Sequence, residues 1–402
     1  MGPRIMMRDA VEALVRAWDA HERARGASSI IDFDYRPLDE PVAPASSRLD
    51  VLTGMTRLHA EAVSSPDCEV ATDALAHLTY VSAQLGERLA FETYVHRTQG
   101  CSAAGWPDEH VTAVGDVARR ALADLDVGWD DQTEETMTVA EGRLPADLAI
   151  DAVLAAAAEL EPAVRRLTGT SAPYHLDAES VDVDEYWSYW LSGEGSRQRL
   201  RLNLRRAVFT EVRARQFALH EILGHALQAA SLAQAARDEA VPWVRLSCVH
   251  DPRQVHFEGL ATALPLLVAP DDTAVAARVR LDHYLHLVRA ELHRAVNDGV
   301  GLGECAALAR RRVPFWTDAT ISDVLADRGA DPLLRSYLWA YPAGTDWFVN
   351  LADHADAPTI ERVLRASYER PLTPAELAAL WPAGPGIGGS GAAVRVRQPA
   401  LP

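Results

Sequence analysis

The chain has 402 residues, 48% of them hydrophobic and 24% charged, so it is long enough for one large domain or two lobes with a substantial core. Its formal net charge of −18 disfavours nucleic acid and anionic membranes as partners, because both are bound by concentrations of Lys and Arg. The sequence contains no lysine at all, which excludes a Schiff-base lysine, pyridoxal phosphate attachment and a Walker A lysine.

The cysteines and the apolar runs bear on the compartment. Cys68, Cys101, Cys248 and Cys305 are far apart and form no C-x-x-C pair, so we expect neither a disulfide framework nor a cysteine zinc site. No apolar run reaches the length of a transmembrane helix, and residues 1–25 lack the continuous apolar segment of a signal peptide. These features predict a cytoplasmic protein that does not bind membranes.

The first part of the chain reads as helices joined by polar loops. Apolar residues at helical spacing predict helices over 1–26, 48–64, 71–97, 111–125 and 144–167, with loops at 27–46, 100–107 and 128–135. None of these segments carries a chemical motif. We expect residues 1–170 to form an N-terminal helical lobe.

One region has the pattern of strands. The aromatic run 187–192 and the alternating run 200–204 flank Gly193 to Ser196, which predicts a β-hairpin. An exposed strand edge there could pair with an extended peptide, and a purely structural hairpin covering the core is an equally good interpretation.

The second part of the chain reads as a helical lobe over residues 171–381. Predicted helices cover 211–237, 255–268, 273–297, 320–326, 333–339, 347–354 and 359–367. Thr373 with Glu376 three residues later marks another helix start. Gly and Pro dominate from residue 382, so we expect 382–402 to be a disordered tail.

The central motif is H-E-x-x-x-H, running from His220 and Glu221 to His225 within an apolar helical run. Histidines five residues apart project about 140° from one another on a regular α-helix and would not face one metal ion. A π-bulge absorbs one extra residue. We therefore predict a widened helix between Glu221 and His225, with Gly224 tolerating the strain.

Glu258, in the later run His256-Phe257-Glu258-Gly259-Leu260-Ala261, completes a candidate metal site. His220, His225 and Glu258 supply two nitrogen ligands and one oxygen ligand, which suits one catalytic Zn²⁺ per chain with an open fourth position. Glu221 is then the general base that takes a proton from the zinc-activated water. The alternative is a helix with unrelated histidines, but charged groups are rarely placed unpaired in such apolar runs. Manganese, cobalt and iron share these ligand types.

The motif resembles those of known metallopeptidases. His220 to His225 is similar to the H-E-x-x-G-H motif of dipeptidyl peptidase III, and Glu258 to Ala261 resembles the EGLA of the QEGLA-motif relatives of tyrosine carboxypeptidases. The order of residues 183–381 also resembles bacterial helical metallopeptidase-like proteins, although Ala226 and Phe257 depart from the motifs of these families. The resemblance implies a mainly α, two-lobed gluzincin-like fold, with a small β-hairpin beside an active-site cleft and Glu as third ligand.

Supporting residues are expected around the metal. Zincins of this kind need a donor to the developing oxyanion, for which Tyr341 and His286 are the candidates, with Tyr337 behind them. On a straight helix His256 would face away from Glu258, which indicates a structural role.

Arg280 and Arg335 could clamp a substrate carboxylate, but a surface or ion-pair role is the stronger expectation for single arginines.

Three hypotheses about function follow. The first is a zinc hydrolase that cleaves a peptide or amide bond in small peptides or chain ends. The second is the same site acting on a small non-peptide metabolite, because function depends on the site rather than on the fold. The third is a non-catalytic metal-binding protein, which would not need Glu221.

Overall fold

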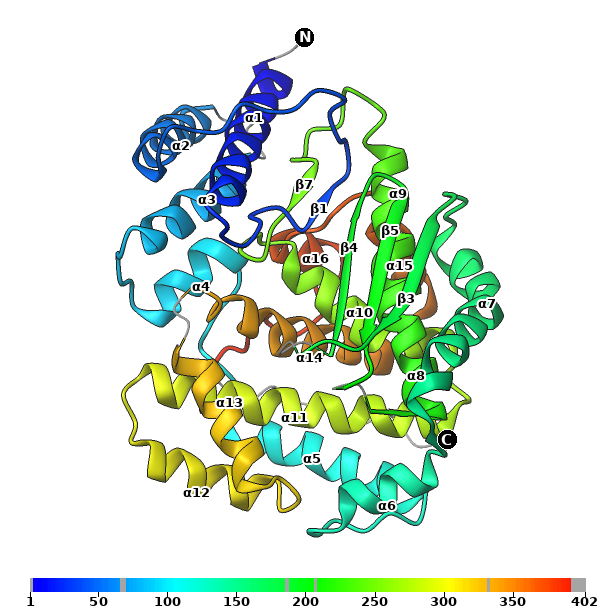
Figure 1. Cartoon of the computed structure of the whole chain (residues 1–402). Coiled ribbons are helices and arrows are strands. Elements are labelled where there is room, and N and C mark those ends of the chain that lie inside the picture. Colours follow the sequence, from blue (N-terminus) through cyan, green and yellow to red (C-terminus); the bar gives the residue numbers. More distant parts are fainter. Residues whose placement is uncertain (1–2, 66–69, 185–187, 206–207, 331–332, 392–402) are drawn as a thin grey trace.

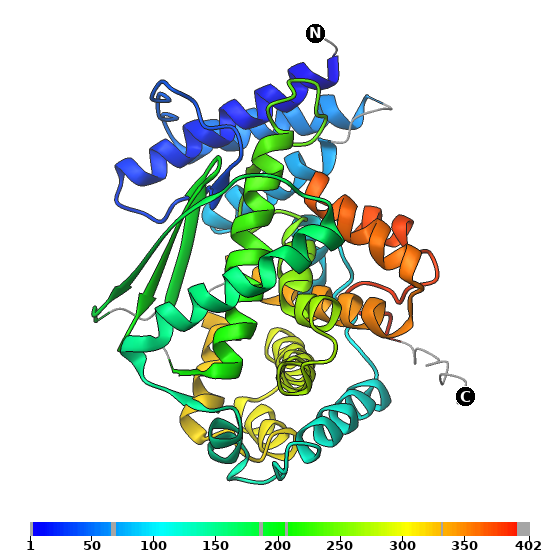
Figure 2. The same cartoon turned by 90° about the vertical axis from the view of Figure 1, so that its right-hand side faces the viewer.

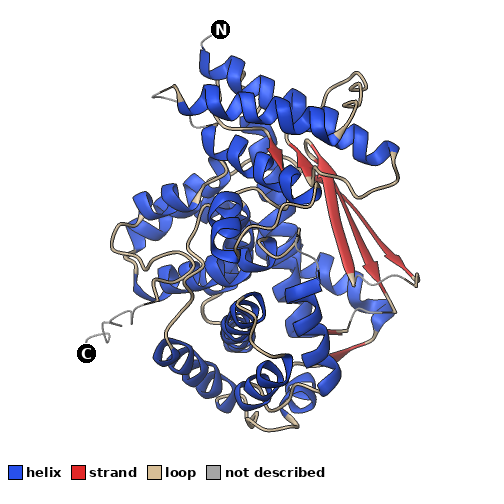
Figure 3. Cartoon of the chain, turned by 90° about the vertical axis from the view of Figure 1, so that its left-hand side faces the viewer, coloured by secondary structure: helices blue, strands red, loops and turns tan. Residues whose placement is uncertain are grey.

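The computed structural model describes residues 3–65, 70–184, 188–205, 208–330 and 333–391. Cys68, Trp187 at the start of the predicted hairpin, and residues 392–402 of the predicted tail lie outside these ranges. The fold is mainly helical, and Figure 3 shows the long strands gathered on one side of the helical body. This much of the predicted fold class is confirmed.

The helices before the sheet are α1 (Pro3–Ala24), α2 (Arg48–Val63), α3 (Ala71–Gln84), α4 (Phe91–Gln99), α5 (Asp108–Ala123), α6 (Thr133–Ala140) and α7 (Ala149–Thr168). The later ones are α8 (Glu211–Phe217), a π-helix (Ala218–Ala226), α9 (Leu227–Ala235), α10 (Gln254–Val268), α11 (Thr273–Asn297), α12 (Leu302–Arg312), α13 (Asp318–Ala330), α14 (Tyr337–His354), α15 (Ala357–Glu369) and α16 (Pro374–Leu380). Thr373 and Glu376 form the expected capping box at the start of α16.

The principal sheet has the strand order β3-β5-β4-β1-β7. Its strands are β1 (Phe33–Asp34), β3 (His175–Val181), β4 (Tyr189–Glu194), β5 (Arg197–Asn203) and β7 (Leu246–Ser247). A second, two-stranded sheet pairs β2 (Arg143–Leu144) with β6 (Phe209–Thr210). The predicted hairpin is confirmed, because β4 and β5 pair antiparallel with Tyr189 opposite Leu202. Strand β3, which pairs parallel to β5, was not predicted, because its alternating run holds few of the β-branched and aromatic residues that mark strands.

Several predicted boundaries of helices and loops were wrong. The predicted helix 71–97 is two helices, because the chain turns at Gly86, which has φ 101°. The predicted helices 333–339 and 347–354 are replaced by the single helix α14, which begins only at Tyr337 and accommodates the buried Pro342 in its second turn. Helix α6 begins inside the predicted loop 128–135, where Thr133 accepts a hydrogen bond from the backbone of Asp130.

The largest hydrophobic core lies around the π-helix, α10 and α14 and takes buried residues from both sides of the predicted boundary at residue 170. Figure 2 shows α11 end-on, surrounded by other helices. The division into two lobes stays a prediction. A smaller cluster joins α1, α2 and α3 to β7, at the top of Figure 1.

Part of the predicted tail is packed rather than disordered. Ile387 is buried, and its carbonyl accepts a hydrogen bond from Ser102 N at 3.2 Å. Gly105 N donates to Gly388 O at 3.1 Å. Gly388 and Gly389 both have positive φ and lie so close to the 102–105 backbone that no side chain would fit. Residues 382–391 therefore belong to the folded chain.

Helices α10 and α14 cross at two glycines. A Cβ on Gly259 would lie 2.4 Å from the carbonyl carbon of Gly344, and one on Gly344 would lie 2.0 Å from the oxygen of Val255. Only glycine permits this approach at either position. The crossing holds Glu258, next to Gly259, against the face of α14 that carries Tyr337 and Tyr341.

Candidate metal centre

The central motif lies on a π-helix, so the predicted widening is confirmed. The hydroxyl of Thr210 caps the preceding helix α8 by accepting from Arg213 N at 3.0 Å. The widened segment follows without interruption and leads directly into α9. The hydroxyl of Tyr368, from α15, donates to Leu223 O in the middle of this segment at 2.7 Å.

Gly224 contributes through close packing. It does not have a positive φ, and a Cβ there would lie 2.8 Å from Leu219 O and 2.9 Å from the Cβ of Ala261 on α10. The π-helix therefore lies against α10 at this point, which brings its two histidines towards Glu258.

Three ligand atoms converge at this contact. His220 Nε2 lies 3.2 Å from His225 Nε2 and 3.5 Å from Glu258 Oε2, while His225 Nε2 lies 3.6 Å from Glu258 Oε2. A point roughly 2.0 Å from all three atoms exists near the plane of this triangle, which matches Zn–N and Zn–O distances of about 2.0–2.2 Å. The residues therefore fit a zinc ion.

Glu258 carries a second indication of a cation. Its Oε2 is buried and has no hydrogen-bond partner among the described residues, although a buried carboxylate oxygen needs one. Burial opposes ionisation of Glu258, yet the adjacent His225 and His220 hold its pKa well below its ordinary value. An ionised, unsatisfied oxygen facing two imidazole nitrogens is the donor set of a metal site.

Glu221 stands beside this triangle and outside it. Its Oε1 lies 3.6 Å from His220 Nε2, and the side chain is almost fully buried. Burial raises the pKa of Glu221 to about 7, with Glu258 adding to the effect and His220 and Tyr189 opposing it. A carboxylate with a pKa near neutrality is suited to general base catalysis.

Tyr189 is a site residue that sequence analysis missed. It comes from β4, and its phenol lies close enough to Glu221 for the two groups to shift each other's pKa. The charge of Glu221 raises the pKa of Tyr189 well above its ordinary value, so the hydroxyl stays protonated and can donate. Residue spacing could not reveal Tyr189, because in the sequence β5, β6 and α8 lie between its strand and the motif.

The tyrosines of α14 contact the third ligand. Tyr337 donates to Glu258 Oε1 at 2.8 Å, and its hydroxyl lies 2.9 Å from that of Tyr341. Burial, followed by the nearby Glu258, raises the pKa of both phenols well above their ordinary value. Tyr341 therefore lies in the site as predicted, while Tyr337, which was the secondary candidate, makes the direct contact with Glu258.

The other predicted residues lie at different distances from the metal centre. The ring of His286 packs against that of Tyr341 with centroids 5.8 Å apart, and its Nδ1 lies 3.1 Å from Thr345 Oγ1. His286 therefore contacts Tyr341 rather than a metal ligand. His256 is fully buried and accepts from Leu372 N at 3.2 Å, which supports the structural role predicted for it.

Neither arginine considered as a clamp reaches the ligands. Arg280 pairs with Asp353 at 2.7 Å, in line with the ion-pair role expected for it. Arg335 donates to Leu89 O at 2.6 Å and stacks over the ring of Tyr94.

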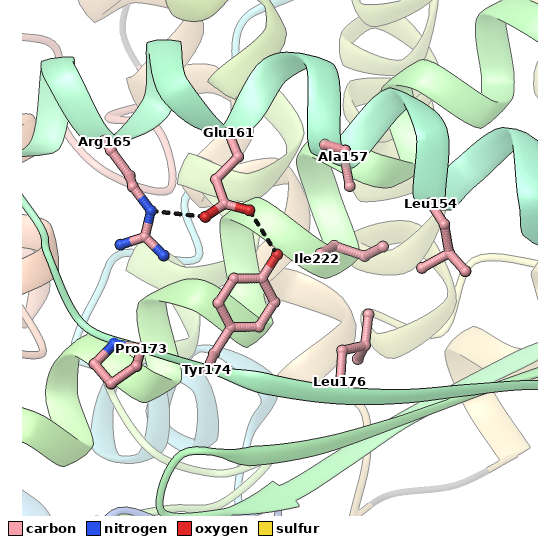
Figure 4. A pocket seen from close by; sticks show the side chains of 9 residues that line it. Leu154, Ala157, Glu161, Arg165, Pro173, Tyr174, Leu176 and Ile222 are labelled. Carbon is pink, nitrogen blue, oxygen red and sulfur yellow. Dashed lines mark hydrogen bonds and ion pairs between the residues drawn. The ribbon is translucent and has the colours of Figure 1, made fainter.

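A separate cavity of about 390 Å³ lies between α7 and β3 (Figure 4). Its polar wall is a short network in which Glu161 accepts from Arg165 Nε at 2.7 Å and from the hydroxyl of Tyr174 at 3.1 Å. Ile222 is the one residue of the π-helix that lines it. This cavity is distinct from the metal centre.

Comparison with known proteins shows a fold but no family. No protein-family model matches the chain, and no curated protein is similar to it. A crystal structure from Colwellia psychrerythraea, described as a "putative lipoprotein", superposes with a TM-score of 0.56 at 14% identity, over 84% of this chain and 63% of its own. The chain thus spans less than two thirds of that protein, and the likeness is one of fold alone. No helix among the described residues is long and apolar enough to cross a membrane.

Proposed function

We propose that the protein is a zinc-dependent metallohydrolase of the gluzincin type that cleaves a peptide or amide bond. The observation that carries the proposal is the convergence of His220 Nε2, His225 Nε2 and Glu258 Oε2 within 3.2–3.6 Å of one another, with Glu221 adjacent and outside the triangle. A structural zinc site has four protein ligands and needs no extra buried carboxylate.

In the proposed reaction, different residues bind the metal, transfer the proton and position the base. His220, His225 and Glu258 would hold the zinc ion, which would supply Lewis acidity and lower the pKa of the attacking water. Glu221 accepts a proton from the attacking water and passes it to the leaving group. Its raised pKa suits it to this role. The hydroxyl of Tyr189 holds the carboxylate of Glu221 in place.

The tyrosines of α14 take two roles. Tyr337 orients Glu258 through its hydrogen bond to Oε1, as outer residues commonly do for metal ligands. Tyr341 is the proposed donor to the developing oxyanion, with its hydroxyl oriented by Tyr337 and its ring packed against His286.

The sheet offers a way to bind a peptide in extended form. Strand β4 pairs with β5 along its whole length, whereas β1 pairs only with Gly193 and Glu194. The edge from Tyr189 to Ser192 therefore has no strand partner among the residues described here, and it contacts the π-helix. An extended peptide could add to this edge through main-chain hydrogen bonds and reach Glu221. Small peptides or chain ends are the proposed substrates.

We place the enzyme in the cytoplasm, because Cys101, Cys248 and Cys305 are unpaired and buried, as suits a reducing compartment. The Colwellia protein's description suggests an extracytoplasmic location instead. Fractionation of cells that produce this chain distinguishes the two, since release with the cytoplasmic fraction supports our placement.

A peptide-library digestion followed by mass spectrometry tests the proposed activity. The zinc-loaded protein is compared with Glu221→Gln, which keeps all three metal ligands. Cleavage by the wild type that the variant lacks supports a metallopeptidase. Full zinc occupancy in both proteins with no cleavage by either overturns the peptidase proposal and directs the search to non-peptide substrates.

A further inference from the structure

A second group of potential metal ligands lies away from the first, between α3 and the segment after β7. It consists of His77, Cys248 and His250, which are 3%, 0% and 1% exposed. Each offers one ligand atom, and these atoms all lie within 4.8 Å of one another. His77 Nδ1 is 2.8 Å from His250 Nε2.

The hydrogen bonding of this group is incomplete. His250 Nδ1 is buried and has no hydrogen-bond partner among the described residues. The imidazole cannot rotate freely to find one, because the ring of Tyr80 stacks on it with centroids 4.0 Å apart and planes 12° apart. Buried polar nitrogens are rarely left unpartnered in native proteins, but this nitrogen is not the one that faces His77, so it marks the unusual burial of the ring rather than the ligand atom itself.

The electrostatic surroundings favour a cation. The acidic side chains Asp19, Asp73 and Asp251 lie within electrostatic range of Cys248. Arg253 neutralises part of this charge by pairing with Asp73 and Asp251. A divalent cation at this position would offset the negative charge that Arg253 leaves unpaired.

We propose that His77, Cys248 and His250 bind a second, thiophilic transition-metal ion of the zinc class, which fastens the N-terminal helices to the β7–α10 connection. One thiolate and two imidazoles are ligands that zinc accepts, and the thiolate excludes magnesium and calcium as good occupants. The two ring nitrogens would have to separate from 2.8 Å to roughly 3.3 Å, the spacing that Zn–N bonds of about 2.05 Å require in a tetrahedral site.

The location indicates a structural role. All three side chains are buried, and Gln254, where α10 begins, is four residues beyond His250. The metal would thereby join α3 to the start of the helix that carries Glu258. The proposal departs from the expectation that the cysteines bind no zinc. That expectation rested on the absence of a C-x-x-C pair, and 173 residues separate His77 from His250.

Cobalt substitution tests the proposal without relying on activity. The purified full-length protein is stripped of metal and titrated with Co²⁺, and the near-ultraviolet thiolate-to-cobalt charge-transfer band is recorded. Only a cysteine ligand produces this band, so the His220, His225 and Glu258 site is silent. We expect the band in the wild type and in His225→Ala, and its loss in Cys248→Ser.

Controls keep the test decisive. Cys101→Ser and Cys305→Ser replace buried cysteines elsewhere and should keep the band. His77→Gln should also lose the band and serves as a second test if Cys248→Ser fails to fold. Circular dichroism shows whether each variant is folded. A wild type with no band, or a band that survives in folded Cys248→Ser, would overturn the proposal.

Discussion

The glycine crossing between α10 and α14 yields a quantitative prediction. In Gly259→Ala the new Cβ would lie 2.4 Å from the carbonyl carbon and 2.5 Å from the Cα of Gly344, both of them backbone atoms. Carbon atoms in contact prefer about 3.5–4.0 Å, so the two helices must separate by roughly 1 Å. Because the neighbouring atoms belong to the main chain, no side-chain rotation can relieve the clash.

The cost can be set against the intrinsic preference of a helix for alanine. Overpacking of this kind costs up to about 3 kcal/mol, and alanine recovers about 1 kcal/mol relative to glycine, so we expect a net loss of about 2 kcal/mol in unfolding free energy. The same movement separates Glu258 from Tyr337 and from the two histidines. We therefore also expect at least a tenfold loss of zinc affinity at this centre, equivalent to about 1.4 kcal/mol.

Urea unfolding of the metal-free protein, followed by a competition titration with a chromophoric chelator, measures the two effects separately. Gly303→Ala is the matched control, because it is also in a helix but its Cβ would meet no atom within 4 Å. It should leave stability unchanged or slightly raised. If Gly259→Ala unfolded at the same urea concentration as the wild type and bound zinc equally well, the crossing would not hold the centre together.

Three further outcomes are expected. Tyr337→Phe removes the hydrogen bond to Glu258 Oε1 and should lower zinc affinity by about 10- to 100-fold in the same chelator titration, with unchanged affinity counting against an orienting role. Glu221→Gln should keep the zinc but reduce turnover of any identified substrate by about 10²- to 10⁴-fold, and a variant that turned over normally would remove Glu221 as the base. Asp346→Asn should lower the unfolding free energy by about 2–3 kcal/mol at pH 7, because the buried carboxylate accepts from Trp106, His110 and His283. Although burial opposes it, these histidines hold the pKa of Asp346 below its ordinary value. The carboxylate of Asp346 therefore contributes its full stabilisation above about pH 4, and the contribution is lost at lower pH. The difference in unfolding free energy between the wild type and the variant, measured in urea, should shrink as the pH falls below about 4. A difference that does not change with pH would contradict this account.

What the sequence predicted well was local. The i, i+5 spacing of His220 and His225 in an apolar run required a widened helix if both were to face one ion, and the π-helix is present. The Gly-containing turn, with an aromatic run before it and an alternating run after it, predicted the β4–β5 hairpin correctly. In both cases the signal lies within fewer than about twenty neighbouring residues.

What it could not predict depends on contacts between distant elements. Tyr189 joins Glu221 only because β4 lies beside the π-helix, and no spacing encodes that contact. Gly259 and Gly344 are 85 residues apart in the sequence, and their need for glycine arises only once the two helices cross. Glu258 was predicted as a ligand because a charged side chain lies in an apolar run, but its geometry depends on this crossing.

The most direct test of the metal centre is the zinc content of the protein after equilibrium dialysis against zinc, measured for the wild type beside His225→Ala. We predict that the variant holds one zinc fewer per chain, whether or not the site at Cys248 is also filled, because each mononuclear site contributes one ion. Equal zinc content in the two folded proteins, or a wild type that binds none, would contradict the central claim.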